Sequence, residues 1–287
     1  MILPDFVLTS RQNKIWSESG LDSISLCRDT AHFRNYPHEV IYNYNSRGFR
    51  DSEWPLSLEE LRDSIWCFGD SFTVGLGSPL NHTWVNILQT IAGKRCINVS
   101  MDGASNVWIA RKIKRVIEEI NPKTIVVQWS YAHRDEIDDP TKTDEERRMA
   151  FDENDNFFIE PTLLRTEACI NTIKRTDGKI IHSFIPDWNV NLDITEIWDS
   201  ICGSSWPSMP TSSLEFNGLS EAIVSELIAF DVYSRLKDMI VSKEILSRML
   251  SDIQYIPDVT VLDWARDKHH YGIVTATKLV NDIIELC

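Results

Sequence analysis

Residues 64–75 read Ser64-Ile65-Trp66-Cys67-Phe68-Gly69-Asp70-Ser71-Phe72-Thr73-Val74-Gly75, and this segment sets the architecture of the chain. Its first half is a short apolar run. Gly69-Asp70-Ser71 follows at once, with residue types that favour turns. A short apolar run that stops at such a turn is typical of a buried strand. We therefore expect a strand over 64–68, with Ser71 just beyond its carboxyl end.

Similar runs recur along the chain and alternate with helical patterns. Further strands are expected at 96–99, 124–129, 179–185 and 259–262. Apolar residues at helical spacing separate them, as in 84–91 and 105–120, and a last amphipathic pattern lies at 279–284. Strands separated by helices pair in parallel. The sequence thus predicts an α/β fold, a three-layer α/β/α sandwich with a five-stranded, mainly parallel sheet.

The chain has 287 residues, without an internal repeat or an obvious linker. We expect a single domain over 1–287, in which residues 1–60 form an N-terminal extension that packs on the core. Residues 187–255 form an insertion suited to a lid or to a surface for substrate or partner. Three tryptophans in it are candidates to line a substrate groove, namely Trp188, Trp198 and Trp206.

Composition narrows the function classes. The 43 acidic residues outnumber the 29 Lys and Arg residues, which gives a formal charge of −14. This acidity argues against nucleic acid or an anionic membrane as the main partner. The chain lacks a signal-peptide pattern and a long apolar span, and its six cysteines are scattered. We expect a cytoplasmic protein with reduced thiols and no cofactor.

Ligands of open parallel sheets bind beyond the carboxyl ends of the strands. The loops at that edge carry Ser71, Gly103, Ser130 and the pair Asp267 and His270. A serine hydroxyl becomes an effective nucleophile only when a base takes its proton, and histidine titrates in the suitable range. A carboxylate three residues before a histidine can orient the imidazole and stabilise its charged form. These residue types are those that acyl transfer requires.

Several motifs make the chain resemble the SGNH (GDSL-type) hydrolase family over about residues 43–135 and 258–285. The motifs are Gly69 to Gly75, similar to G-D-S-x-[ST]-x-G; Asn98 to Gly103, similar to the second block; Asp267-Lys268-His269-His270, matching D-x-x-H; and Asn45 to Arg50, similar to an N-S-x-G-F-R stretch. The resemblance implies the flavodoxin-like fold of that family. It also implies Ser71 as nucleophile and oxyanion donor, Gly103 as a second donor, Asp267 as carboxylate and His270 as base.

The third block departs from the family pattern. That block usually reads G-x-N-D, and its Asn supplies a side-chain donor, whereas here Ser130 to Arg134 contains no Asn. Ser130 and His133 are the candidate replacements, and the alternative is that the third donor is absent. Together with Gly103, Ser130, Asp70 and Asn106 complete the expected oxyanion and substrate-binding set, in which Asp70 acts mainly as an acceptor that stabilises the turn. Arg50 and Arg134 are expected to pair with carboxylates near this edge.

Two alternatives remain for individual residues. His269 competes with His270 as the base, and Asp263 competes with Asp267 as the carboxylate.

The leading functional hypothesis is a metal-independent serine ester hydrolase, an acylesterase or carbohydrate O-deacetylase. Its substrate is a small acyl ester or an O-acetylated glycan. The first alternative is a metal-dependent phosphoesterase that uses Asp70, Asp102, His133 and His270. The second is a catalytically weak module on the same fold that binds glycans or protein partners.

Overall fold

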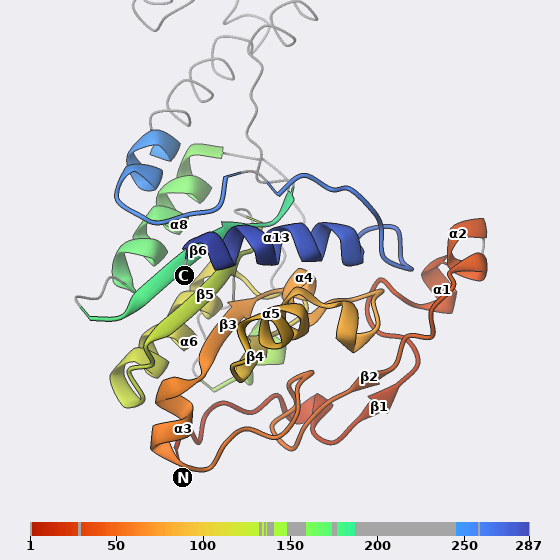
Figure 1. The fold of residues 1–287 in the computed structure, drawn as a ribbon, viewed down its shortest axis with the longest axis horizontal. Helices are drawn as coiled ribbons and strands as arrows, with labels where there is room; N and C mark the ends of the chain where they lie inside the picture. Colours follow the sequence, from red (N-terminus) through yellow and green to blue (C-terminus); the bar gives the residue numbers. More distant parts are fainter. Residues whose placement is uncertain are drawn as a thin grey trace, which may run out of the picture.

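The computed structural model describes residues 2–27, 30–131, 134, 136, 141–147, 159–173, 177–186, 245–257 and 259–286. Figure 1 shows the arrangement of the elements. In chain order they are η1 (Thr9–Arg11), β1 (Ile15–Trp16), α1 (Ile24–Cys27), α2 (Ala31–Asn35), β2 (Tyr42–Asn43), α3 (Leu58–Asp63), β3 (Ile65–Gly69), α4 (Ser71–Val74), η2 (Leu80–His82), α5 (Trp84–Ala92), β4 (Cys96–Ser100), α6 (Asn106–Glu119), β5 (Thr124–Trp129), α7 (Asp144–Arg147), α8 (Ile159–Thr172), β6 (Lys179–Phe184) and α13 (Ile273–Leu286).

The main sheet confirms the predicted α/β class. Its strands run in the order β4-β3-β5-β6, and every pair is parallel. The register places Phe68 beside both Val99 and Val127, so the carboxyl ends of β3, β4 and β5 lie together. Since Ser71 follows β3 directly, the sheet presents it at this edge.

The predicted fifth strand at 259–262 is wrong. The main sheet of the described residues has four strands, and Tyr255 adds only a single parallel bridge to His182. The competing interaction is local, because the hydroxyl of Thr275 accepts hydrogen bonds from the N–H groups of Leu262 (2.8 Å) and Asp263 (3.2 Å). Their amides are thus bound to the start of α13 instead of to a neighbouring strand.

Helices cover both faces of the sheet, as the three-layer prediction requires (Figure 1). Side chains alternate along each strand. Trp66 and Phe68 of β3 pack in the apolar cluster that includes residues of α6 and α8. Cys67, between them in the sequence, packs with residues of α5 and α13 on the opposite face. Both clusters are buried, and they hold the carboxyl edge of the sheet in place.

The first 60 residues contribute side chains to this core. Leu3, Phe6, Leu8 and Phe49 are buried in the same cluster as Trp66. Nearby, β1 and β2 form a two-stranded antiparallel pair. The N-terminal segment therefore packs against the strands that carry the candidate site.

Much of the predicted insertion at 187–255 lies outside the described residues. This applies to Trp188, Trp198 and Trp206 and to most of the expected helical pattern, while residues 245–251 are helical. The assignment of this segment as a lid or binding surface stays a prediction. Among the helices that the structure describes, none has the length and apolar character needed to cross a bilayer.

Candidate active site

The turn after β3 presents Ser71 on a single turn of helix. All five residues of β3 are buried, and Asp70 caps α4 by accepting a hydrogen bond from the N–H of Phe72 at 3.0 Å. Gly69 is needed for close packing, because a Cβ there would lie 2.0 Å from the Thr73 hydroxyl oxygen. Gly75 ends the helix in the left-handed conformation. These contacts give the two glycines and the aspartate of the G-D-S-x-T-x-G pattern a structural explanation.

The histidine and its carboxylate lie in a compact loop before α13. An antiparallel bridge joins Trp264 to Tyr271, and the N–H of Ala265 donates to the His270 carbonyl at 2.8 Å. Within this loop, one oxygen of Asp267 accepts hydrogen bonds from the backbone N–H groups of His269 and His270, both at 3.0 Å. The loop backbone therefore fixes the carboxylate before any side-chain contact is made.

The fold brings three predicted side chains into one hydrogen-bonded series. His270 Nε2 lies 2.8 Å from Ser71 Oγ, and His270 Nδ1 lies 2.5 Å from Asp267 Oδ2. Ser71 and His270 are 3% and 1% exposed, so bulk water competes little with these contacts. The arrangement is that of a nucleophile, a base and an orienting carboxylate.

The charge of Asp267 determines the proton positions in this series. Burial alone would raise the pKa of Asp267, but the side-chain hydrogen bond with His270, the attraction of that ring when it is protonated, and the two backbone N–H groups lower it below its ordinary value. An ionised carboxylate can only accept, so Nδ1 of a neutral His270 carries the proton. Nε2 then turns its lone pair towards the Ser71 hydroxyl, which is the geometry of a general base.

The two rival residues, His269 and Asp263, make other contacts. His269 is exposed, and its ring centroid lies 4.9 Å from that of His270. Asp263 serves another purpose, because its carboxylate accepts from the N–H groups of Val274 (3.1 Å) and Thr275 (2.9 Å) at the start of α13. Thus His270 contacts Ser71, and Asp267 contacts His270.

Ser71 and Gly103 are the expected sources of two backbone N–H donors. The ends of β3 and β4 are paired, Gly69 with Ser100, so the loops that carry Ser71 and Gly103 are adjacent. Gly103 adopts a φ of 73°, a conformation that favours glycine. Within the described part of the chain, the N–H groups of Ser71 and Gly103 donate no hydrogen bond.

Asn106 and Ser130 use their hydrogens for contacts within the protein. Asn106 donates both amide hydrogens, to the Ser130 carbonyl and the Thr166 hydroxyl at 3.1 Å each, while the N–H of Ser130 donates to the Asn106 oxygen at 2.8 Å. The Ser130 hydroxyl donates to Asp70 at 2.7 Å. These two residues fix the loop after β5, and the other candidate replacement, His133, lies outside the described residues.

Asp70 likewise serves a structural purpose. The carboxylate is fully buried and also pairs with Arg134, at 2.6 Å. A carboxylate has no hydrogen to donate to an oxyanion, so Asp70 orients the turn as expected. The predicted carboxylate partner of Arg134 is thus confirmed. Arg50 differs, because its guanidinium donates to backbone carbonyls instead of a carboxylate.

Two positions were not identified from the sequence. A Cβ on Gly77, whose φ is 74°, would lie 2.9 Å from the carboxyl carbon of Asp267, so only glycine admits that carboxylate. Gln128 of β5 accepts from the Thr73 hydroxyl at 3.1 Å and donates to the Tyr271 hydroxyl at 3.0 Å. Gln128 thus links the turn that carries Ser71 with the loop that carries His270 through buried hydrogen bonds. A glycine and a strand glutamine carry no local sequence signal for such contacts.

Three residues of the metal alternative have other partners, and the fourth, His133, lies outside the described residues. Asp70 pairs with Arg134, Asp102 lies 3.6 Å from Arg11, and His270 contacts Ser71 and Asp267. Among the residues that the structure describes, no group of three or more His, Cys, Asp or Glu side chains is arranged to hold a metal ion. The donor set thus does not favour the phosphoesterase hypothesis.

A groove of about 1290 Å³ lies away from this site. It is lined by residues that precede the strands, including Ser64 before β3, Arg95 before β4 and Lys123 before β5. Parallel strands place these positions at the opposite edge of the sheet from Ser71. The groove therefore plays no part in the chemistry of Ser71 and His270.

Comparisons with known proteins find similar solved structures. No family model matches the sequence, and no curated protein matches it. It is similar to the crystal structure of TesA, with 12% identity over 78% of this chain and 97% of that chain, at a TM-score of 0.42. It is also similar to a lipolytic protein of the G-D-S-L family from Veillonella parvula, with 15% identity over 78% of this chain and 97% of that chain, at a TM-score of 0.35. A third similar structure is that of the psychrotrophic esterase EstA from Pseudoalteromonas sp., with 12% identity over 78% of this chain and 95% of that chain, at a TM-score of 0.36. The solved structures that this chain is similar to thus include a G-D-S-L lipolytic protein and an esterase.

Proposed function

We propose that this protein is a serine ester hydrolase of the SGNH (GDSL) type that acts through an acyl-enzyme on Ser71. One observation carries the proposal, the continuous contact from Ser71 through His270 to Asp267, at 2.8 and 2.5 Å. The ionised state of Asp267 supports it, because it leaves His270 able to accept the serine proton.

In the first half of the reaction, Ser71 Oγ bonds to the carbonyl carbon of an ester while its proton passes to His270 Nε2. Asp267 stabilises the imidazolium. The carbonyl oxygen becomes negatively charged and accepts hydrogen bonds from the N–H groups of Ser71 and Gly103. The bond from carbon to the alcohol oxygen then breaks, and His270 returns the proton to the departing alcohol.

In the second half, water replaces the alcohol. His270 takes a proton from water as its oxygen bonds to the acyl carbon, and the two N–H groups again stabilise the oxyanion. The bond to Ser71 Oγ breaks, the proton returns to Ser71, and a carboxylic acid leaves. Each step uses residues of this chain, and the reaction as written needs no metal.

We propose a small acyl ester as substrate, with an O-acetylated glycan as the natural class. The surroundings of His270 support an organic substrate with an apolar part. The ring centroid of Phe72 lies 4.5 Å from that of His270. The partly exposed Tyr131 packs edge-on to Phe72, with 6.4 Å between the ring centroids. Phe72 is buried, so the half-buried Tyr131 is the aromatic side chain that an apolar part of the substrate would meet.

The test is turnover of p-nitrophenyl acetate by the full chain and its variants. Ser71→Ala and His270→Ala should each lower kcat by at least about 10³-fold. The matched control is His269→Ala, which removes the exposed neighbouring imidazole and should keep kcat within about threefold. Wild-type turnover that persists in folded Ser71→Ala would refute the assignment. Absence of wild-type turnover and of reaction at Ser71 would favour the binding-module alternative.

A further inference from the structure

A buried ion pair joins the N-terminal segment to the histidine loop. Asp22 is fully buried and accepts two hydrogen bonds from Arg266, from Nε at 2.8 Å and from Nη2 at 2.5 Å. Such bidentate pairing fixes both the distance and the orientation of an arginine. Arg266 directly precedes Asp267, so the carboxylate of Asp22 determines where the histidine loop lies.

Tyr42 connects the same carboxylate to the nucleophile side. Its hydroxyl donates to Asp22 at 2.6 Å and accepts from the N–H of Gly77 at 2.7 Å. The Gly77 carbonyl in turn accepts from the N–H of Arg266 at 2.8 Å. Both polar backbone groups of Gly77 are thereby held at the position where its α-carbon faces Asp267.

Arg50 holds the chain that follows the nucleophile helix. Its guanidinium donates to the carbonyls of Gly75 (2.6 Å) and Ser78 (2.8 Å) and lies 4.3 Å from the centre of the Tyr42 ring. Burial lowers the pKa of Arg50 because desolvation disfavours the charged guanidinium, and the carbonyl acceptors offset part of that cost.

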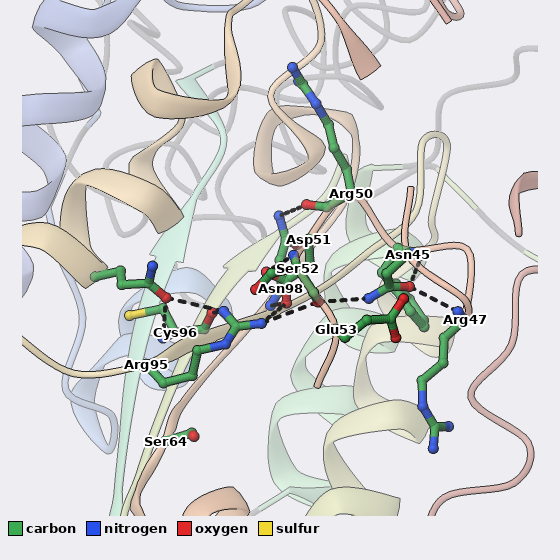
Figure 2. Close-up of polar contacts among 12 residues, drawn as sticks. Asn45, Arg47, Arg50, Asp51, Ser52, Glu53, Ser64, Arg95, Cys96 and Asn98 are labelled. Carbon is green, nitrogen blue, oxygen red and sulfur yellow. Dashed lines mark hydrogen bonds and ion pairs between the residues drawn. The ribbon is translucent and has the colours of Figure 1, made fainter. Parts of the chain in front are cut away.

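The backbone around Arg50 is anchored to β4. Figure 2 shows that the Arg50 side chain points away from Asp51, while Asp51 turns towards β4. Asp51 accepts from Arg95 at 2.7 Å and from the N–H of Asn98 at 3.0 Å, and the Asn98 amide donates to the Thr73 carbonyl at 3.2 Å. The Asn45–Arg50 motif is therefore fixed to the sheet on one side and reaches the nucleophile loop on the other.

A neighbouring helix supports the same loop. His32 of α2 contacts the Ala265 carbonyl at 2.7 Å, and the Arg266 guanidinium packs over the ring of Phe33 at 4.8 Å. In Figure 1 the segment that leads into α13 approaches α1 and α2 on this side of the molecule. The histidine loop is thus bound to the N-terminal segment at several points.

We propose that Asp22, Tyr42 and Arg50, termed the N-terminal clamp, are positioning residues that hold the histidine loop against the nucleophile loop. Their catalytic effect rests on the proposed function. They act on Ser71 and His270 only through Arg266, Gly77 and the chain at 74–78. A misplacement of about 1 Å at a reacting pair can lower a rate about 10²-fold, so small movements of either loop would be measurable.

The experiment compares Asp22→Asn and Tyr42→Phe with wild type and with Asp282→Asn. The first variant removes the charge that pairs with Arg266, and the second removes only the hydroxyl that joins Asp22 to Gly77. The control breaks an exposed ion pair on α13, between Lys278 and Asp282. For each full-length protein, kcat and KM are measured with p-nitrophenyl acetate, together with amide hydrogen exchange of peptides covering 70–80 and 262–273.

The clamp predicts that both test variants lose at least about tenfold in kcat while KM changes by less than about threefold. It also predicts faster exchange in 70–80 and 262–273, with unchanged exchange in β5 and in the control variant. A general loss of structure would instead raise exchange throughout the sheet. Should Asp22→Asn fail to fold, Tyr42→Phe decides, because it leaves the ion pair intact.

Two outcomes separate this inference from the proposed function. If wild type hydrolyses the ester and the folded variants match it in kcat and exchange, the clamp is wrong and the esterase stands. If wild type shows no hydrolysis, the proposed function fails. Exchange in the two loops then still decides whether the N-terminal segment holds them together.

Discussion

The Nε2 atom of His270 lies 2.8 Å from the hydroxyl oxygen of Ser71, although 199 residues separate the two in the sequence. This contact joins two local structures. One is the strand and turn that carry Ser71, and the other is the loop of 264–271 that orients Asp267 on His270. A substitution that changes the distance between Ser71 and His270 should therefore change kcat.

Gly77→Ala should separate activity from stability. A Cβ at Gly77 would lie 2.9 Å from the carboxyl carbon of Asp267, so the carboxylate must move and His270 with it. We expect kcat to fall by at least about tenfold and the free energy of unfolding to fall by about 1–2 kcal/mol, since alanine is strained at positive φ. Ester turnover and urea denaturation measure the two effects.

Gly93→Ala is the matched control for that variant. Gly93 also has a positive φ, 62°, but nothing lies within 4 Å of the position that its Cβ would take. It should show a similar loss of stability with kcat unchanged. Equal activity losses in the two variants would mean that backbone strain, and not displacement of Asp267, is responsible.

Arg134→Met should destabilise the protein more than an exposed ion-pair deletion does. Removal of the guanidinium leaves the fully buried carboxylate of Asp70 without its ionic partner. Breaking a buried pair in this way costs about 3 kcal/mol or more, whereas the double variant Asp70→Asn with Arg134→Met should recover much of that loss. Urea denaturation of the single and double variants tests this. Lys278→Met, at an exposed pair, should cost less than about 1 kcal/mol.

Gln128→Leu tests the buried link between Thr73 and Tyr271. The amide joins the Thr73 hydroxyl to that of Tyr271, and all three side chains are buried. We expect a loss of about 1–3 kcal/mol in unfolding free energy, because two buried hydroxyls lose a partner. The exposed Gln254→Leu serves as control. A Gln128→Leu protein as stable as this control would show that the link contributes nothing to stability.

His182 should make the fold sensitive to acid. The imidazole is buried, which lowers its pKa from 6.5 to about 4. In the unfolded chain it takes up a proton near pH 6.5, whereas in the folded protein it does so only near pH 4. Stability is therefore full above about pH 6.5 and falls by about 3 kcal/mol as the pH drops towards 4.

His182→Gln measures that contribution, because glutamine does not titrate. Urea denaturation at pH 7.5 and pH 4.5 should show a smaller acid loss in this variant than in wild type. His269→Gln, at the exposed neighbour of His270, should retain the wild-type loss. Identical pH dependence in wild type and His182→Gln would contradict the buried-histidine explanation.

Local sequence signals predicted the parts of the fold and site that form locally. The apolar run before Gly69, the turn at Asp70-Ser71 and the three-residue spacing of Asp267 and His270 each lie within one short segment. The alternation of strands and helices then placed both segments at one edge of a parallel sheet. For these elements, the structure has the contacts that the residue types require.

The remaining features depend on partners that the sequence does not reveal. The expected strand at 259–262 is absent because Thr275 binds the amides of Leu262 and Asp263. Asn106 and Ser130 have suitable hydrogens, but their neighbours in the folded chain already use them. The contact between Asp22 and Arg266 spans 244 residues, and no local pattern marks either residue. Tertiary contacts settled each of these cases.

The most direct test of the central claim is mass spectrometry of the full chain after treatment with a fluorophosphonate. Such a reagent forms a covalent bond with an activated serine oxygen and releases fluoride. We predict one adduct per chain, on the peptide that contains Ser71, and its loss in His270→Ala. No adduct, or an adduct on another residue with Ser71 unmodified, would contradict the account.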